Sequence, residues 1–268
     1  MQFDSTLVDE LAGQLDQAER DRKQIPQFSR TYSGMTIDDA YAVQDAWVRK
    51  KVAAGQKIIG HKIGLTSRAM QRAVNINEPD YGVLLSPMQF HDGQTIPIDR
   101  FIEPRVEVEI AFILKKPLQG PNCTIFDVLN HSDYVVPAME IIDARIERID
   151  REGRGTRTVI DTISDNAANA GIVMGGRPMR PDAIDLRWVS AILHRNGEIE
   201  ETGVGAAVLN HPANGPAWLA NRLSRFGVSL EAGEIILGGS FTGQVFVRPG
   251  DSFHVDFGPM GSIGMRFA

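Results

Sequence analysis

The chain has little of several residues and patterns that mark specialised protein classes. It contains 1 cysteine in 268 residues, which excludes an internal disulfide and fits a reducing compartment. Lysine and arginine number 28 against 34 acidic residues, and a net charge of −6 argues against phosphate-neutralising contacts with nucleic acid. No apolar run approaches the roughly 18 residues of a membrane span, and the first residues lack a signal-peptide pattern. These absences predict a cytoplasmic protein with neither nucleic-acid nor membrane partners.

What remains is the composition of an ordinary globular protein. Apolar residues make up 43% of the chain and charged residues 23%, close to the averages for soluble proteins. A chain of this length should bury roughly 70–75% of the surface that its unfolded form exposes. The composition therefore predicts an enzyme or a ligand-binding protein whose core needs no cross-links.

The first part of the chain has a helical pattern. Leu7, Leu11 and Leu15 recur at helical spacing among polar residues. Thr36 precedes a second predicted helix, because its hydroxyl can accept a hydrogen bond from the third amide of that helix. Two helices before any strand predict an N-terminal helical region at residues 1–56.

The second part, residues 57–268, consists mainly of short β-type runs between turn residues. Asn196-Gly197 predicts a hairpin, and one helix is predicted from about Ala213 to Phe226. Regular strand–helix alternation is missing, which argues against a doubly wound sheet and for the α+β class. The predicted strands are 58–63, 106–114, 135–142, 172–174, 186–194, 235–237, 253–257 and 263–267.

Common cofactor and hydrolase motifs are missing from the sequence. There is no phosphate-binding GxxxxGK[ST] loop and no HExxH zinc helix. The run that begins at Gly203 lacks the last glycine of a dinucleotide loop, and Ser240 lacks the second glycine of a nucleophile elbow. NAD, ATP and serine-hydrolase chemistry are therefore disfavoured.

Carboxylates on two predicted strands form the most informative pattern. Strand alternation puts Glu107 and Glu109 on one face, about 7 Å apart along the strand. Such a pair usually belongs to a solvent-exposed face. Glu140 differs, because it is the one charged residue in a run that is otherwise apolar on both faces and should be buried.

A buried carboxylate needs a compensating positive charge. Arg105 or Arg145 can supply it in an ion pair. Alternatively, Glu140 converges with Glu107 and Glu109 on one hard divalent cation, since Mg²⁺ prefers oxygen ligands. The residues alone leave both interpretations open.

Two further polar residues lie near predicted turns. Lys62 stands between short residues at a strand end, where a lysine is usually a solvated surface charge. Near a divalent cation its amine can instead transfer protons. Asp80 belongs to a predicted turn, in which its carboxylate can serve the turn alone.

Six segments resemble the hydratase and decarboxylase branch of the fumarylacetoacetate hydrolase superfamily. They follow one another in the same order as in that branch and span nearly the whole chain. The resemblance implies an N-terminal helical region followed by a mixed β-sheet roll or sandwich of the fumarylacetoacetate hydrolase C-terminal type. The segments are GHKIGLTS (60–67), EPDYG (78–82), PRVEVEIAF (104–112), PAMEIIDAR (137–145), DTISDNAANAG (161–171) and VLNHPANGPAWLAN (208–221).

The resemblance also implies roles for individual residues. It assigns Glu107, Glu109 and Glu140 to one Mg²⁺ or Mn²⁺, and Lys62 and Asp80 to acid/base catalysis. It further implies a homo-oligomer assembled from dimers.

The implied substrate is a small unsaturated 2-oxo dicarboxylate, which a lyase of this branch hydrates. Ser164 and Asn166 are implied substrate contacts, and His61, Arg68 and Arg105 are candidates for binding the second carboxylate. Decarboxylation of such an acid, or hydration of a shorter one, are the alternative activities. A non-catalytic partner subunit of a decarboxylase–hydratase complex is the alternative that is not an enzyme.

Overall fold

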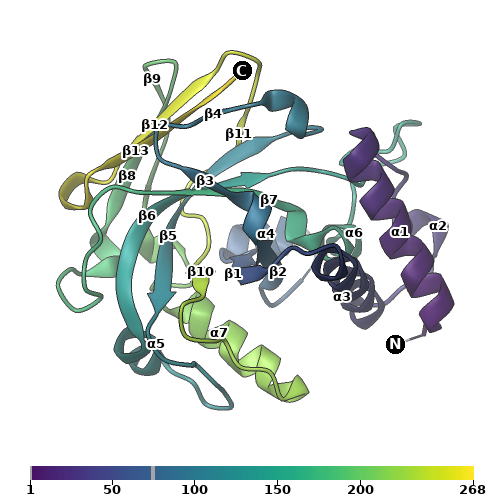
Figure 1. Cartoon of the computed structure of the whole chain (residues 1–268), viewed down its shortest axis with the longest axis horizontal. Coiled ribbons are helices and arrows are strands. Elements are labelled where there is room, and N and C mark those ends of the chain that lie inside the picture. The colour runs from purple at the N-terminus through teal and green to yellow at the C-terminus, as the bar shows by residue number, and fades with distance from the viewer. Residues whose placement is uncertain (1, 74–75) are drawn as a thin grey trace.

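The N-terminal segment forms the helices that its apolar spacing predicts. A computed structural model describes residues 2–73 and 76–268 of the chain (Figure 1). In it, α1 spans Ser5–Asp21, α2 spans Phe28–Thr31 and α3 spans Ile37–Ala53. The predicted cap at Thr36 is confirmed, because its hydroxyl accepts from the amide of Asp39, whose carboxylate accepts from the Thr36 amide.

The larger of two β-sheets has eight strands in a mixed arrangement. Its order is β2-β1-β10-β5-β6-β7-β3, and β11 also pairs with β5. The pairs β1/β10 and β3/β7 are parallel, and the others are antiparallel. The strands are β1 (Ile58–Gly64), β2 (Asp80–Leu85), β3 (Gln89–His91), β5 (Arg105–Leu114), β6 (Ser132–Ile142), β7 (Asn169–Met174), β10 (Ile235–Leu237) and β11 (Val245–Phe246).

The smaller sheet has five strands in the order β4-β13-β12-β8-β9. The hairpin predicted at Asn196-Gly197 is confirmed between β8 and β9, with φ angles of 56° and 87°. These strands are β4 (Thr95–Ile96), β8 (Ser190–Arg195), β9 (Glu198–Val204), β12 (Ser252–Asp256) and β13 (Ser262–Phe267).

One predicted strand, residues 186–194, begins later than expected. Leu186–Trp188 is a 3₁₀ turn, since the carboxylate of Asp185 accepts a hydrogen bond from the amide of Arg187. The side chain of Trp188 is exposed, so the apolar pattern of this run did not reflect strand burial. The strand β8 starts at Ser190.

In residues 2–73 and 76–268, four further helices lie among the strands: α4 (Arg68–Ala73), α5 (Ile125–His131), α6 (Val159–Ser164) and α7 (Asn214–Leu223). The helix predicted near the C-terminus is thus confirmed as α7, which continues as a 3₁₀ turn and ends at Gly227 with a φ of 70°. None of the helices in the described part of the chain is long and apolar enough to cross a membrane. Short 3₁₀ turns also occur at Ser86–Met88, Ile98–Arg100, Asn166–Ala168, Gly205–Ala207 and Gly258–Met260.

Hydrophobic clusters fix which face of each strand remains for polar groups. Val108 and Ile110 of β5 pack with side chains from β12 and β13 of the smaller sheet. A second cluster joins Trp47 of α3 to Val83 of β2 and to α6. Because Val108 and Ile110 face the core, Glu107 and Glu109 lie on the other face of β5.

The domain boundary at residues 56–57 stays a prediction, and so does the assembly of the chain into a homo-oligomer.

Candidate metal and active site

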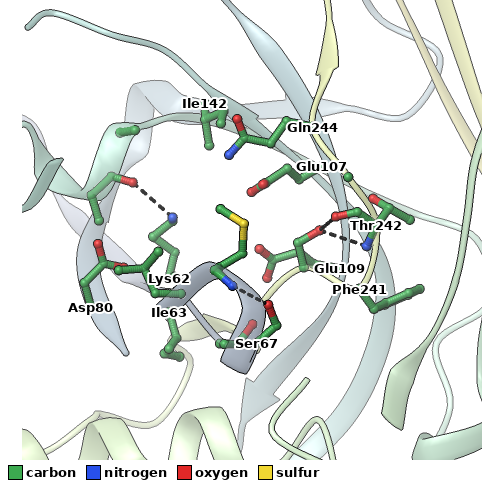
Figure 2. A pocket seen from close by; sticks show the side chains of 18 of the residues that line it. Lys62, Ile63, Ser67, Asp80, Glu107, Glu109, Ile142, Phe241, Thr242 and Gln244 are labelled. Atoms are coloured by element: carbon green, nitrogen blue, oxygen red, sulfur yellow. Dashed lines mark hydrogen bonds between the residues drawn. The ribbon is translucent and has the colours of Figure 1, made fainter. Parts of the chain in front are cut away.

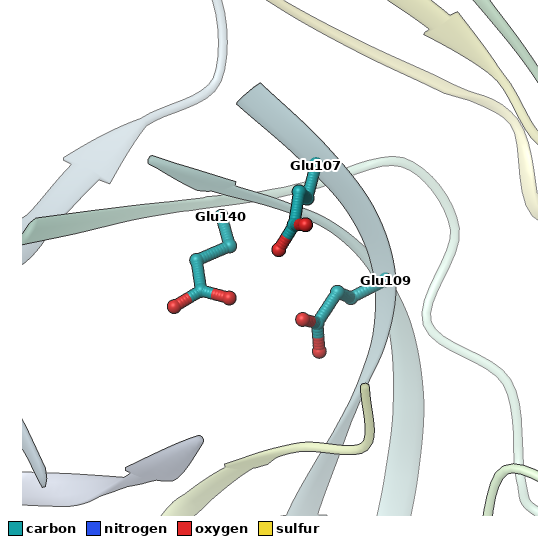
Figure 3. Close-up of side chains that lie close together, drawn as sticks. All are labelled: Glu107, Glu109 and Glu140. Carbon is teal, nitrogen blue, oxygen red and sulfur yellow. The ribbon is translucent and has the colours of Figure 1, made fainter. Parts of the chain in front are cut away.

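Strand register brings the three predicted carboxylates together (Figure 3). Glu107 of β5 lies directly opposite Glu140 of β6, and Glu109 follows on the same face two residues along. One carboxylate oxygen of each residue lies within 4.8 Å of the others. Neither Arg105 nor Arg145 forms an ion pair with Glu140 among the described residues, so this alternative is not realised.

The carboxylate cluster has the properties of a site for a hard divalent cation. Burial, and then the charge of Glu140, raise the pKa of Glu107 to about 7, and the same two causes raise the pKa of Glu109. One buried oxygen of Glu140, Oε2, finds no hydrogen-bond partner among the described residues. Three oxygen donors that repel one another fit Mg²⁺ or Mn²⁺, which would offset the repulsion.

Neighbouring groups hold each carboxylate in place. The amide of Gly239 donates to Glu109 Oε2 at 2.8 Å, and Asn169 Nδ2 donates to Glu140 Oε1 at 2.7 Å. The side chain of Gln244 lies beside Glu107 (Figure 2) and is itself held by Arg105, whose Nη1 donates to Gln244 Oε1 at 3.1 Å. Such supporting contacts fix the orientation of metal ligands.

Lys62 reaches the same sheet face from β1. Its Nζ lies 3.3 Å from Glu140 Oε1 and donates to the carbonyl oxygen of Ala167 at 3.0 Å. The residue is 4% exposed, so it is not a solvated surface lysine. Burial by itself lowers the pKa of Lys62, but the carboxylates of Glu140 and Asp80 raise it above its usual value. The amine is therefore protonated when the carboxylates carry no metal.

Asp80 starts β2 instead of lying in the predicted turn, because the register of β1 and β2 places it opposite Gly64. Both its carboxylate oxygens are buried and lack hydrogen-bond partners among the described residues. Burial raises the pKa of Asp80, and the charge of Lys62 opposes this effect. A Cβ atom at position 64 would stand 2.3 Å from Asp80 Oδ1, so glycine is required for this approach.

The segment after α6 supports the site, and two of its predicted contacts are revised. Ser164 Oγ donates to the carbonyl of Ile160. Asn166 Oδ1 accepts from the amide of Val83 at 2.8 Å, and Asn166 Nδ2 donates to the carbonyl of Val83 at 2.9 Å. Neither side chain lines the cavity. Asn166, Ala167 and Ala168 have φ angles of 54°, 49° and 63°, which non-glycine residues rarely adopt. Asn166 thus acts as a positioning residue that fixes the turn presenting the Ala167 carbonyl to Lys62.

None of the three residues predicted to bind a second carboxylate lines the cavity. His61 projects from the opposite face of β1, because it adjoins Lys62 in the strand, and its Nδ1 lies 3.4 Å from Glu234 Oε2. Arg68 is exposed on α4, and Arg105 holds Gln244.

These elements enclose a cavity of about 420 Å³, with Lys62 and Asp80 on one side and Glu107 and Glu109 on the other (Figure 2). Arg157 also lines the cavity. It was not predicted from the sequence, because no periodic pattern marks the loop before α6. The lining residues are Lys62, Ile63, Gly64, Leu65, Thr66, Ser67, Met70, Asp80, Glu107, Glu109, Ile142, Arg157, Thr162, Ala167, Ala168, Thr202, Ala207, Ser240, Phe241, Thr242, Gly243 and Gln244.

The metal-free protein is expected to lose stability as the pH rises from 4.5 to about 7. In the unfolded chain Glu107 ionises near 4.5, whereas in the folded protein it keeps its proton up to about pH 7. The folded state therefore binds more protons in this window, and the free energy of unfolding falls with rising pH. Glu109 contributes in the same direction.

Melting temperatures measured across this window in EDTA test the expectation. The decline should be smaller in a Glu107→Gln variant and in the presence of Mg²⁺, because both remove the cost of ionising the cluster. An equally steep decline in Glu107→Gln would contradict the assignment to Glu107.

Known proteins match this chain over most of its length. The family model for the fumarylacetoacetate (FAA) hydrolase C-terminal region matches residues 58–268. A 2-oxo-hept-4-ene-1,7-dioate hydratase of Escherichia coli is 63% identical over 99% of this chain and 99% of its own. A 2-keto-4-pentenoate hydratase of Paraburkholderia xenovorans (strain LB400) is 39% identical over 97% of this chain and 94% of its own.

A solved structure has the same fold. The 4-oxalocrotonate decarboxylase from Pseudomonas putida G7, complexed with magnesium and adipate, matches with a TM-score of 0.94 and 36% identity over 99% of both chains. The predicted α+β fold class and the resemblance stated from the sequence are confirmed. With the family model covering most of its length and relatives matching it from end to end, the chain belongs to the fumarylacetoacetate hydrolase family.

Proposed function

We propose that the protein is a divalent-metal-dependent hydratase, a lyase that converts 2-oxohept-4-ene-1,7-dioate to 4-hydroxy-2-oxoheptanedioate in homoprotocatechuate (4-hydroxyphenylacetate) degradation. The observation that carries the proposal is a cavity lined by buried Lys62 and Asp80 and by two glutamates, Glu107 and Glu109, which form a carboxylate cluster with Glu140. The name and the 63% identity of the Escherichia coli relative support the choice of substrate.

Glu107, Glu109 and Glu140 would hold the cation in this proposal. A bound Mg²⁺ supplies Lewis-acid stabilisation of negative charge at the C2 oxygen of a 2-oxo acid. The chain's own contribution is to hold these three carboxylates on one sheet face, beside a cavity that can take the substrate.

Lys62 and Asp80 would transfer the protons. Removal of a proton from C3 forms an enolate, and return of a proton at C5 moves the double bond to C3–C4, next to the C2 carbonyl. Water then adds at C4, and C3 takes up a proton, so the net change is the gain of one water molecule. The Asp80 carboxyl, whose pKa burial raises, is suited to accept and return these protons. The Lys62 ammonium group is suited to donate to the developing negative charge and to orient the water.

A second candidate is decarboxylation of a 2-oxo dicarboxylate, as performed by 4-oxalocrotonate decarboxylase, whose structure matches this chain with a TM-score of 0.94. Hydration of a shorter acid, 2-hydroxypenta-2,4-dienoate, is a further alternative, supported by the 39% identity of a pentenoate hydratase. All three reactions pass through an enolate of a 2-oxo acid, so the product distinguishes them.

Incubation with 2-oxohept-4-enedioate, followed by NMR and mass spectrometry, tests the proposal. The product is expected to gain the mass of one water molecule, EDTA should abolish the reaction, and Mg²⁺ should restore it. Loss of the mass of carbon dioxide would instead identify a decarboxylase. If the protein binds Mg²⁺ but does not convert this acid, the shorter dienoates are the next substrates to test. If these are not converted either, the interpretation as a non-catalytic partner subunit is favoured.

A further inference from the structure

The proposed substrate carries a second carboxylate that the metal cluster does not account for. Two cationic side chains, Lys62 and Arg157, line the cavity among the described residues. Lys62 already contacts Glu140 and the carbonyl of Ala167. Arg157 is therefore the cation that remains for another anionic group.

Backbone contacts fix the position of Arg157 in the loop before α6. Its amide donates to the carbonyl of Arg148 at 2.9 Å, and an isolated bridge pairs Ile149 with Thr156 just before it. The next residue, Thr158, is the N-cap of α6. The guanidinium group thus extends from an anchored part of the chain.

The guanidinium group of Arg157 has an acidic partner that it shares with a second arginine. Arg157 Nη1 lies 3.5 Å from Asp165 Oδ2, the one hydrogen bond of its guanidinium group within residues 2–73 and 76–268. Arg145 engages the same carboxylate through its side chain and through its amide at 2.9 Å. Two guanidinium groups share one buried carboxylate, so Arg157 retains donors and charge for an anion.

Arg157 stays charged at neutral pH in spite of its burial. Its side chain is 10% exposed. Burial, and then the charge of Arg148, lower the pKa of Arg157 to about 10, which still leaves it protonated. The charge of Arg157 lowers the pKa of Asp80. The charges that change the pKa values of Glu107 and Glu109 most are those of Glu140 and Lys62. Its partner Asp165 stands two residues before Ala167, whose carbonyl accepts from Lys62, so Arg157 lies toward the Lys62 and Asp80 side of the cavity.

We propose that Arg157 binds the distal carboxylate of the substrate and selects dicarboxylates over monocarboxylates. The inference rests on the proposed function, which supplies a substrate with a carboxylate at each end. A 2-oxo acid held at the glutamate cluster places its middle carbons near Lys62 and Asp80 and its far end toward Arg157. The planar guanidinium group can pair with a carboxylate through two parallel hydrogen bonds, which a lysine cannot do.

Two saturated acids that differ only at the far end test this role without requiring turnover. Binding of 2-oxoheptanedioate and 2-oxoheptanoate is measured by calorimetry in the presence of Mg²⁺. The natural chain is expected to bind the diacid about 10- to 100-fold more tightly, the range expected for a charge-assisted hydrogen-bonded pair. Arg157→Met should lose this preference and keep its affinity for the monoacid, and Arg157→Lys should recover part of the preference.

Arg68→Met is the matched control, because Arg68 is exposed near the cavity without lining it. This variant should bind both acids as the natural chain does. Monoacid and Mg²⁺ binding also report whether Arg157→Met has folded. A preference for the diacid that persists in Arg157→Met overturns the inference, and so does an equal loss of affinity for both acids.

The test separates this inference from the proposed hydration. If 2-oxohept-4-enedioate is not hydrated but the diacid preference exists and depends on Arg157, the inference holds and the proposed reaction fails. If hydration proceeds while the natural chain binds both acids equally, the reaction stands and the role of Arg157 is overturned.

Discussion

Replacing Lys62 with methionine is expected to lower kcat by about 10²- to 10⁴-fold, the usual contribution of a positioned acid/base group. The change removes the amine that lies 3.3 Å from Glu140 and faces the cavity beside Asp80. Affinity for Mg²⁺ should be retained or increased, because a positive charge is removed next to a metal ligand. Turnover of 2-oxohept-4-enedioate and calorimetric titration with Mg²⁺ measure the two effects separately.

Lys57→Met provides the control, since Lys57 is exposed just before β1. It should leave both kcat and Mg²⁺ affinity unchanged. Unaltered turnover in Lys62→Met would remove this lysine from the mechanism. Loss of Mg²⁺ binding in that variant would mean that Lys62 maintains the carboxylate cluster and would contradict a role limited to proton transfer.

Glu109→Gln is expected to abolish metal-dependent turnover and to weaken Mg²⁺ binding by at least about 100-fold, more than the loss of a group that only supports a ligand. The same change should make the metal-free protein more resistant to heat at neutral pH, since it removes a carboxyl group whose ionisation is disfavoured by burial and by the charge of Glu140. The glutamine oxygen can still accept the hydrogen bond from the amide of Gly239. A gain of stability in the metal-free protein together with a loss of Mg²⁺ binding is the result expected for a metal ligand.

Thermal unfolding with and without Mg²⁺ measures both halves of this prediction. At 100 times its dissociation constant for the natural chain, Mg²⁺ should stabilise the natural chain by about 2.7 kcal/mol and Glu109→Gln by no more than about 0.4 kcal/mol. Glu198→Gln, an exposed substitution on β9, should respond to Mg²⁺ like the natural chain. An equal Mg²⁺-induced rise in Glu109→Gln would show that this residue is not a ligand.

Local sequence determined much of the sheet face that carries the candidate site. Strand alternation along β5 sends Glu107 and Glu109 to one face and valine and isoleucine to the other, as the structure has it. The cap at Thr36 and the turn at Asn196-Gly197 were also predictable. In each case the cause acts over a few residues, so the pattern is visible without the fold.

Tertiary structure alone decided which charges meet. Long-range pairing selected Lys62, and not an arginine, as the ion-pair partner of Glu140. It also turned Asn166 toward the backbone of Val83, 83 residues away in the sequence. Arg157 comes from a loop with no periodic signal, and a bridge between Ile25 and Ile146 ties the start of that loop to a distant part of the chain. The sequence thus determined the residue types and faces, whereas long-range pairing determined their partners, because the energy of a buried charge depends on the groups that the fold brings within a few ångströms of it.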